Sequence, residues 1–173
     1  MEVTITKASI ADIPQLVTLI NSAYRGEESK KGWTTEADLL EGKRVNTNGL
    51  EKIINTPGAT ILKCTNENEN IIGCVYLKKN DNKMYLGMLT VAPQLQNSGI
   101  GKQLLQAADM YAKEHGCTSV VMSVISVRKE LIQSYERQGY MQTGATKPFP
   151  MGDVRFGIPK QPLEFVILEK ALH

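Results

Sequence analysis

A glycine-rich turn between a strand and a long helix is the feature that most constrains how this chain can fold. Residues 84–91 have the apolar content and the flanking turn residues typical of a strand. The turn covers residues 96–102 and contains Gly99 and Gly101. Beyond it, apolar residues recur at helical spacing up to Gly116 and form one stripe: Ile100, Leu104, Leu105, Ala108, Tyr111 and Ala112. Any fold of this chain therefore joins a strand to an amphipathic helix across this turn.

The turn has the properties of an anion-binding site. Residues without side chains let the backbone approach a ligand closely, and the unpaired N–H groups of the first helical turn point outward. Each charge-assisted hydrogen bond to a phosphate oxygen is worth roughly 1.5–3 kcal/mol, so a few such amides can hold a pyrophosphate. The alternative interpretation is a turn whose glycines only allow the strand and the helix to pack closely.

Two common phosphate-binding motifs do not fit this spacing. A dinucleotide fingerprint would need glycine at position 104, which is Leu104. A Walker A loop would need glycine at position 96 and serine or threonine at position 103, and these are Gln96 and Gln103. Both spacings count against a nucleotide-binding module.

The remaining apolar patterns predict a sheet with helices. Three strands separated by asparagine-rich turns indicate an antiparallel meander, at residues 59–65, 71–79 and 84–91. Further strands are predicted at residues 3–7, 119–125 and 163–168. Helices are predicted after the Ser9 cap, near Thr35, over residues 49–55 and around Tyr135. Residues 144–162 are rich in proline and glycine and are predicted to be a long loop. The loop either takes part in function or covers the core with its apolar residues.

Composition narrows the class of protein. A chain of 173 residues has the usual length of one domain, so we expect residues 1–173 to form a single domain. The net charge is only +2, with 20 Lys and Arg scattered among 18 acids, so we expect no nucleic-acid partner. We expect neither a membrane segment nor a leader, and hence a cytoplasmic location. Three widely spaced cysteines and two histidines give no metal-ligand pattern, so we expect no metal.

Two motifs resemble one known family. The pattern V-x-P-x-x-Q-x-x-G-x-G, from Val91 to Gly101, resembles motif A of the GNAT (GCN5-related) N-acetyltransferases. The segment Tyr135-Glu136-Arg137-Gln138-Gly139-Tyr140 is similar to that family's motif B, and the predicted order of elements agrees over nearly the whole chain. The resemblance implies an α+β, three-layer fold, with a mixed, mostly antiparallel central sheet and helices on both faces.

The resemblance also implies acetyl-coenzyme A as the co-substrate. In the family, the strand that ends at Val91 and the strand that begins near Ser119 would splay apart, and pantetheine would lie between them. Carried over to this chain, the residues that bind the co-substrate are Leu89, Thr90, Val91, Gln96, Asn97, Ser98, Gly99, Ile100, Gly101, Lys102, Arg128 and Tyr135. Arg128 stands where the family often has asparagine, so it either reaches a phosphate or is a solvated cation at the start of a helix.

The implied reaction is direct attack of a primary amine on the acetyl thioester in a ternary complex. By family analogy, the backbone N–H of Leu89 stabilises the oxyanion. Tyr135 would protonate the leaving thiolate, and its alternative interpretation is a core aromatic residue. Residues 84–89 lack the glutamate that serves many relatives as general base, so the base stays undetermined.

The acceptor is a small molecule, an amino acid or a peptide, and an aromatic and acidic cluster between the first two helices is its candidate wall. The cluster comprises Tyr24, Glu27, Glu28, Trp33, Glu36 and Asp38. It would suit a cationic amine, and a solvated surface is the equal alternative. Transfer of another acyl group and a non-catalytic acyl-coenzyme A sensor are the rival functions. The sequence leaves the oligomeric state open, with a homodimer as one option.

Overall fold

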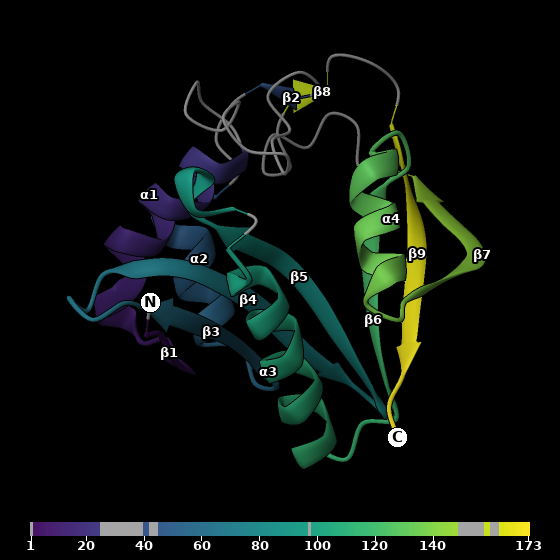
Figure 1. Cartoon of the computed structure of the whole chain (residues 1–173), viewed down its shortest axis with the longest axis horizontal. Coiled ribbons are helices and arrows are strands. Elements are labelled where there is room, and N and C mark those ends of the chain that lie inside the picture. Colours follow the sequence, from purple (N-terminus) through teal and green to yellow (C-terminus); the bar gives the residue numbers. More distant parts are fainter. Residues whose placement is uncertain (1, 25–39, 42–44, 97, 149–157, 160–162) are drawn as a thin grey trace.

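The computed structural model describes residues 2–24, 40–41, 45–96, 98–148, 158–159 and 163–173, and it contains one large sheet with helices on both faces (Figure 1). The large sheet has seven strands in the order β1-β3-β4-β5-β6-β9-β7. Their bounds are β1 Thr4–Lys7, β3 Ala59–Thr65, β4 Ile71–Asn80, β5 Lys83–Val91, β6 Ser119–Ile125, β7 Met141–Pro148 and β9 Glu164–Ala171. Two short strands, β2 (Leu40–Glu41) and β8 (Ile158–Pro159), pair separately.

Only one neighbouring pair in the large sheet is parallel. β5 and β6 run in the same direction, and all other pairs of this sheet are antiparallel. The predicted meander is confirmed as β3, β4 and β5. The parallel pair arises because β5 and β6 are connected through a helix, which brings the chain back to the same end of the sheet.

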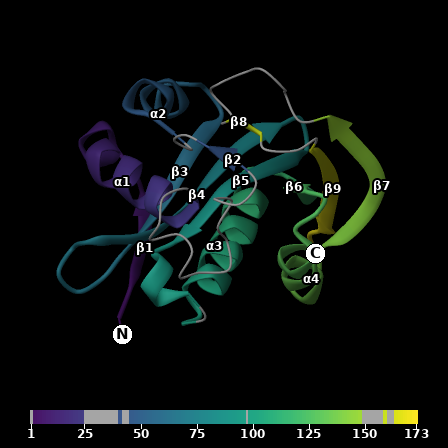
Figure 2. The ribbon, with the colours of Figure 1, turned by 90° about the horizontal axis from the view of Figure 1, so that it is seen from above.

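The helices lie in two layers on opposite faces of the sheet, as Figure 2 shows from above. On one face lie α1 (Ile13–Tyr24) and α2 (Thr47–Ile54), and on the other lie α3 (Ile100–Glu114) and α4 (Lys129–Arg137). Two 3-10 turns, η1 (Ile10–Asp12) and η3 (Pro93–Leu95), precede α1 and α3. The capping pattern at Ser9 is present, with the Ser9 N–H donating to Asp12 at 2.8 Å.

Each face of the sheet has its own apolar core. Under α3 and α4, Leu104, Met84 and Val120 are fully buried, whereas Leu16 and Ile20 pack with Leu50 under α1 and α2. Side chains alternate between the faces along each strand, so a strand between two helical layers contributes to both cores. This arrangement confirms the predicted α+β, three-layer fold with a mostly antiparallel sheet.

One prediction about the fold was wrong. Residues 144–148 were predicted to be loop, but they belong to β7, whose eight residues are all exposed. An edge strand with no buried face shows no apolar alternation, and Gly144 has a φ of 87° at an irregularity in the pairing with β9. The strand is therefore defined by its partner β9 and not by its own pattern. Phe149, Met151 and Phe156 lie outside the described residues.

Two further findings concern the cysteines and the lengths of the helices. Cys64, Cys74 and Cys117 are buried free thiols. Within the residues that the structure describes, every helix is too short or too polar to span a bilayer.

Candidate active site

The parallel pair β5–β6 separates partway along its length. The two strands are in register from Lys83 opposite Ser119 to Leu86 opposite Met122, and pairing ends there. β6 stays paired with β9 as far as Ile125, and β5 stays paired with β4 as far as Val91. The two strands thus diverge toward their C-terminal ends, as Figure 1 shows between α3 and α4.

A bulge in β5 lies where the strands separate. Cys74 pairs with Thr90 and Tyr76 with Gly87, so the single residue Val75 lies opposite both Met88 and Leu89. Met88 has a φ of 48°, in the left-handed region that few non-glycine residues adopt. The bulge breaks the alternation: Leu86 packs against the core under α3 and α4, but Met88, two residues later, packs against the core under α1 and α2.

Between the separated strands is a narrow gap of about 70 Å³ that is lined from both faces of the sheet. From the α3 and α4 side it is lined by Leu131 and Tyr135, and Arg128 at the start of α4 also lines it. Gly87, Met88 and Ser123 line it from the other side. The remaining lining residues are Leu86, Leu89, Met122, Val124, Ile125 and Phe165. Residues from both faces of the sheet therefore come together at this gap.

The glycine-rich turn follows the end of β5 and begins α3. The first backbone bond across the start of this helix runs from the N–H of Gln103 to the carbonyl of Gly99, at 3.1 Å. The preceding N–H groups, Ile100 to Lys102, have no partner within the helix and point toward its N-terminal end. The first turn contains no acidic residue, so an anion meets no carboxylate of this helix.

The two glycines of the turn differ in what they require. Gly99 has a φ of 88°, which disfavours any residue with a side chain. Gly101 has an ordinary helical position, and a Cβ atom there would lie 3.7 Å from Cγ2 of Val91, an ordinary contact. The fold itself therefore has room for a side chain at Gly101.

Several predicted site residues come together in this region. Leu89, Arg128 and Tyr135 line the same gap, although Leu89 belongs to β5 and the other two to the start and the body of α4. Ser98 and Gln96 hold the turn through side-chain bonds to the carbonyls of Leu95 and Val91, respectively. Asn97 lies outside the described residues.

Two other predicted residues, Thr90 and Val91, do not line the gap. The Thr90 hydroxyl donates to the Met88 carbonyl at 2.8 Å, and the side chain is buried. Val91 packs in the core under α3. Only the backbone of these two residues is left to serve a ligand.

Tyr135 packs against a second tyrosine, which in turn lies beside an ion pair. The rings of Tyr135 and Tyr140 lie 6.0 Å apart in an edge-to-face arrangement, and both residues are buried. Lys170 pairs with Asp109 at 2.7 Å and lies 5.9 Å from the Tyr140 ring. Burial raises the pKa of Tyr140 far above its usual range, with a further contribution from Asp109, so the Tyr140 hydroxyl stays protonated. This cluster restricts how the Tyr135 ring can move.

The predicted acceptor cluster cannot be compared with the structure. Glu27, Glu28, Trp33, Glu36 and Asp38 lie outside the described residues, and Tyr24 is the last residue of α1. Sequence reasoning missed Gly87, Met88, Ser123 and Phe165, which all line the gap. A glycine inside a strand often marks a bulge, and Gly87 was the one available signal. Ser123 and Phe165 carry no comparable signal, because each is one residue of an otherwise ordinary strand.

Comparison with known proteins assigns this chain to a family. The family model described as "Acetyltransferase (GNAT) family" matches residues 14–140, which is most of the chain. The protein belongs to the GNAT family of acetyltransferases. No curated protein matches the chain.

Solved structures share the fold at low sequence identity. An N-acetyltransferase from Staphylococcus aureus Mu50 has a TM-score of 0.75 at 14% identity, covering 99% of this chain and 98% of that one. A PaiA N-acetyltransferase from Thermoplasma acidophilum, in complex with coenzyme A, has a TM-score of 0.68 at 21% identity, covering 99% of each chain. A ribosomal-protein-alanine N-acetyltransferase from Brucella melitensis has a TM-score of 0.72 at 20% identity, covering 98% of this chain and 99% of that one.

Proposed function

We propose that this acetyltransferase moves an acetyl group from acetyl-coenzyme A to a primary amine of a small molecule, an amino acid or a peptide. The observation that carries the proposal is the gap between β5 and β6, which is lined from both faces of the sheet. Such a gap allows a donor and an acceptor to be bound together, and direct attack in a ternary complex requires this.

The residues of the turn and the gap fit acetyl-coenzyme A. The N–H groups at the start of α3 and the open position at Gly101 suit a pyrophosphate, and Arg128 supplies a positive charge at the gap. The register between β5 and β6 ends at Leu86. Beyond this point, the amide-containing pantetheine arm can run beside β5 in the place of a strand partner. When bound, the co-substrate supplies the acetyl thioester.

Two residues carry the chemical step in this proposal. The amine nitrogen forms a bond to the acetyl carbon, the carbon–sulfur bond breaks, and the nitrogen loses one proton. The N–H of Leu89, at the bulge, would donate to the carbonyl oxygen as negative charge develops on it. The hydroxyl of Tyr135 would give its proton to the departing sulfur and regain one from solvent.

The amine has to reach the gap in its neutral form, because a protonated amine has no lone pair for attack. None of the described residues that line the gap is an Asp, a Glu or a His. We infer that water at the mouth of the gap accepts the proton before or during the attack. Activity would then rise with pH toward the pKa of the acceptor amine.

We further propose that residues 1–173 act as a single acyltransferase domain in the cytoplasm. Three buried free thiols support a reducing compartment, since no pair of them forms a disulfide.

Substitution at Gly101 tests the co-substrate site without disturbing the core. Gly101→Val places a branched side chain where the backbone would approach the pyrophosphate, while the nearest contact of its Cβ is an ordinary one. Met110→Val is the matched control, because it puts the same β-branched residue at a position of α3 that is 62% exposed. We expect acetyl-coenzyme A to raise the melting temperature of the wild type and of Met110→Val but not of Gly101→Val. Equal thermal stabilisation of all three proteins would refute the assignment.

A further inference from the structure

Two tyrosines form an aromatic corner on the face of the sheet that carries α1 and α2. The rings of Tyr76 on β4 and Tyr85 on β5 lie 6.2 Å apart at an angle of 66°. Both tyrosines are only partly buried. Burial and the neighbouring Tyr85 raise the pKa of Tyr76, so its hydroxyl stays neutral. The corner is therefore an uncharged aromatic surface in contact with solvent.

This corner adjoins the gap. A Cβ atom at Gly87 would lie 3.2 Å from Cε1 of Tyr85 and 3.4 Å from Cδ1 of Tyr76, so both rings lie directly against Gly87. Gly87 itself lines the gap, and so does Met88, which packs against the same core as Tyr76. The two rings do not line the gap themselves, and Gly87 is the residue that joins the corner to it. A molecule that extends from Gly87 over this face would contact the rings.

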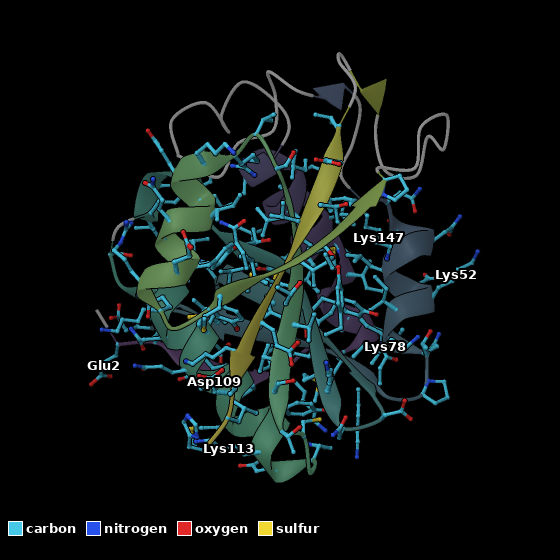
Figure 3. All side chains as sticks on the ribbon, turned by 90° about the vertical axis from the view of Figure 1, so that its right-hand side faces the viewer. Glu2, Lys52, Lys78, Asp109, Lys113 and Lys147 are labelled. Atoms are coloured by element: carbon cyan, nitrogen blue, oxygen red, sulfur yellow. The ribbon has the colours of Figure 1, made fainter. Side chains whose placement is uncertain are left out.

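A positive charge lies beside the corner. Lys78 lies directly opposite Tyr85 across the β4–β5 ladder, so their side chains project from the same face about 5 Å apart at Cβ. Figure 3 shows Lys78 on the same side of the sheet as Lys52 of α2. Glu169, the acidic residue of β9 on this face, pairs with Lys83 at 3.2 Å and is neutralised. Within the described part of this face, the corner therefore repels a second positive charge on a ligand.

We infer that Tyr76 and Tyr85 form the acceptor subsite, and that it selects a primary monoamine with an aromatic or apolar carbon skeleton over a polyamine. The inference rests on the proposed function, because it assumes that the acceptor enters from the face opposite α3 and α4. An aromatic group packs edge-to-face against the corner, which places the amine attached to it at Gly87 and the gap. A polyamine would bring its further charges beside Lys78.

Three amines test the selectivity of wild-type protein. Release of coenzyme A thiol from acetyl-coenzyme A is measured with 2-phenylethylamine, n-propylamine and spermidine. We expect kcat/KM for 2-phenylethylamine to exceed that for each of the other two by about tenfold or more, since burying an aromatic ring against a matching surface gives discrimination of this order. Equal values for 2-phenylethylamine and n-propylamine, or a preference for spermidine, would overturn the inference.

Matched variants locate the preference. Tyr85→Ala removes one ring and should abolish most of the preference for 2-phenylethylamine through a higher acceptor KM, whereas Tyr85→Phe should keep it. Tyr111→Ala is the control, because Tyr111 stacks on His115 in α3, on the other face. Lys78→Glu should raise kcat/KM for spermidine by about two- to fivefold, the size of a surface charge effect. A preference that survives Tyr85→Ala would show that the corner is not the subsite.

A binding measurement separates this inference from the proposed function. Ligand-observed NMR follows 2-phenylethylamine with the wild type, Tyr85→Ala and Tyr111→Ala in the presence of coenzyme A. Binding that only Tyr85→Ala weakens supports the subsite even if no acetyl group is transferred, and in that case the proposed function fails alone. If Tyr85→Ala acetylates and binds the amines as the wild type does, the proposed function stands and the assignment of the subsite is wrong.

Discussion

The two halves of β5 differ in what lies beside them. From Lys83 to Leu86 the strand is paired on both sides, with β4 and with β6. From Gly87 to Val91 the ladder with β4 continues through a bulge, and the gap lies on the side where β6 was paired. Met84 in the first half is fully buried, whereas Leu89 in the second half is half-buried.

This difference shows how one strand serves both stability and binding. In the first half, both edges of the backbone are paired with neighbouring strands, and Met84 and Leu86 fill the core under α3 and α4. In the second half, the register with β6 has ended, and the bulge at Met88 changes which face the side chains meet. Stability should therefore depend on the first half and turnover on the second.

The largest expected effect is a loss of turnover from a substitution beside the second half of β5. Tyr135→Phe removes one hydroxyl beside the gap and keeps the ring that packs against Tyr140. If the hydroxyl protonates the leaving sulfur, kcat should fall by roughly 10²–10⁴ while the affinity for acetyl-coenzyme A stays nearly unchanged. Steady-state kinetics and a thermal shift with acetyl-coenzyme A measure the two quantities.

The same variant distinguishes catalysis from packing. Its free energy of unfolding is measured by urea denaturation alongside the kinetics, and a core role predicts a loss of stability without the large loss of kcat. Wild-type kcat in Tyr135→Phe, under conditions where chemistry limits turnover, would leave Tyr135 as a structural residue.

The next largest effect is a loss of stability from a substitution in the first half of β5. Met84→Ala creates a cavity in a fully buried position and should lower the free energy of unfolding by about 2–5 kcal/mol. Leu89→Ala, in the same strand but beside the gap, should cost less than about 1.5 kcal/mol, because its side chain is half-buried. Urea denaturation of both variants makes the comparison. Equal losses would mean that the gap does not reduce the contribution of the second half.

The smallest expected effect depends on pH and concerns an ion pair far from the gap. Burial raises the pKa of Asp12, but hydrogen bonds from Ser9 and the ion pair with Lys63 at 2.9 Å lower it more, and the net pKa lies below 3.8. A carboxyl whose pKa is lower in the folded state stabilises the fold above its unfolded pKa and loses this contribution as pH falls through the folded pKa. Asp12→Asn keeps an oxygen for the Ser9 N–H and removes the charge.

Unfolding in urea between pH 3 and pH 7 measures this contribution. We expect Asp12→Asn to be less stable than the wild type by about 1 kcal/mol at pH 7, with the difference shrinking as the pH falls below about 4. A difference that is the same at all pH values would mean that hydrogen bonding, and not charge, makes the contribution. In either case, acetyl-coenzyme A binding at pH 7 should not change.

Much of the fold could be predicted because its signals are local. The helix after Gly99 shows its apolar stripe, the meander strands are bounded by asparagine turns, and Gly116 and Gly139 end helices at positive φ. β7 could not be predicted, since an exposed edge strand depends on hydrogen bonds to β9 that its own residues do not signal. For the irregularity at Met88 the neighbouring Gly87 is the one local signal, and its position follows from pairing with Val75 on another strand.

By itself, the sequence determined the glycine-rich turn, the helix that follows it, and the motifs that resemble those of the GNAT acetyltransferases. These features lie within short stretches of chain, where hydrogen bonding and side-chain periodicity act between near neighbours. Only the tertiary structure decided that Leu89, Arg128 and Tyr135 line one gap, that Tyr76 and Tyr85 meet beside Gly87, and that β5 parts from β6 after Leu86. Those contacts join residues on different elements, and their geometry depends on how the whole sheet twists and how both helical layers pack on it.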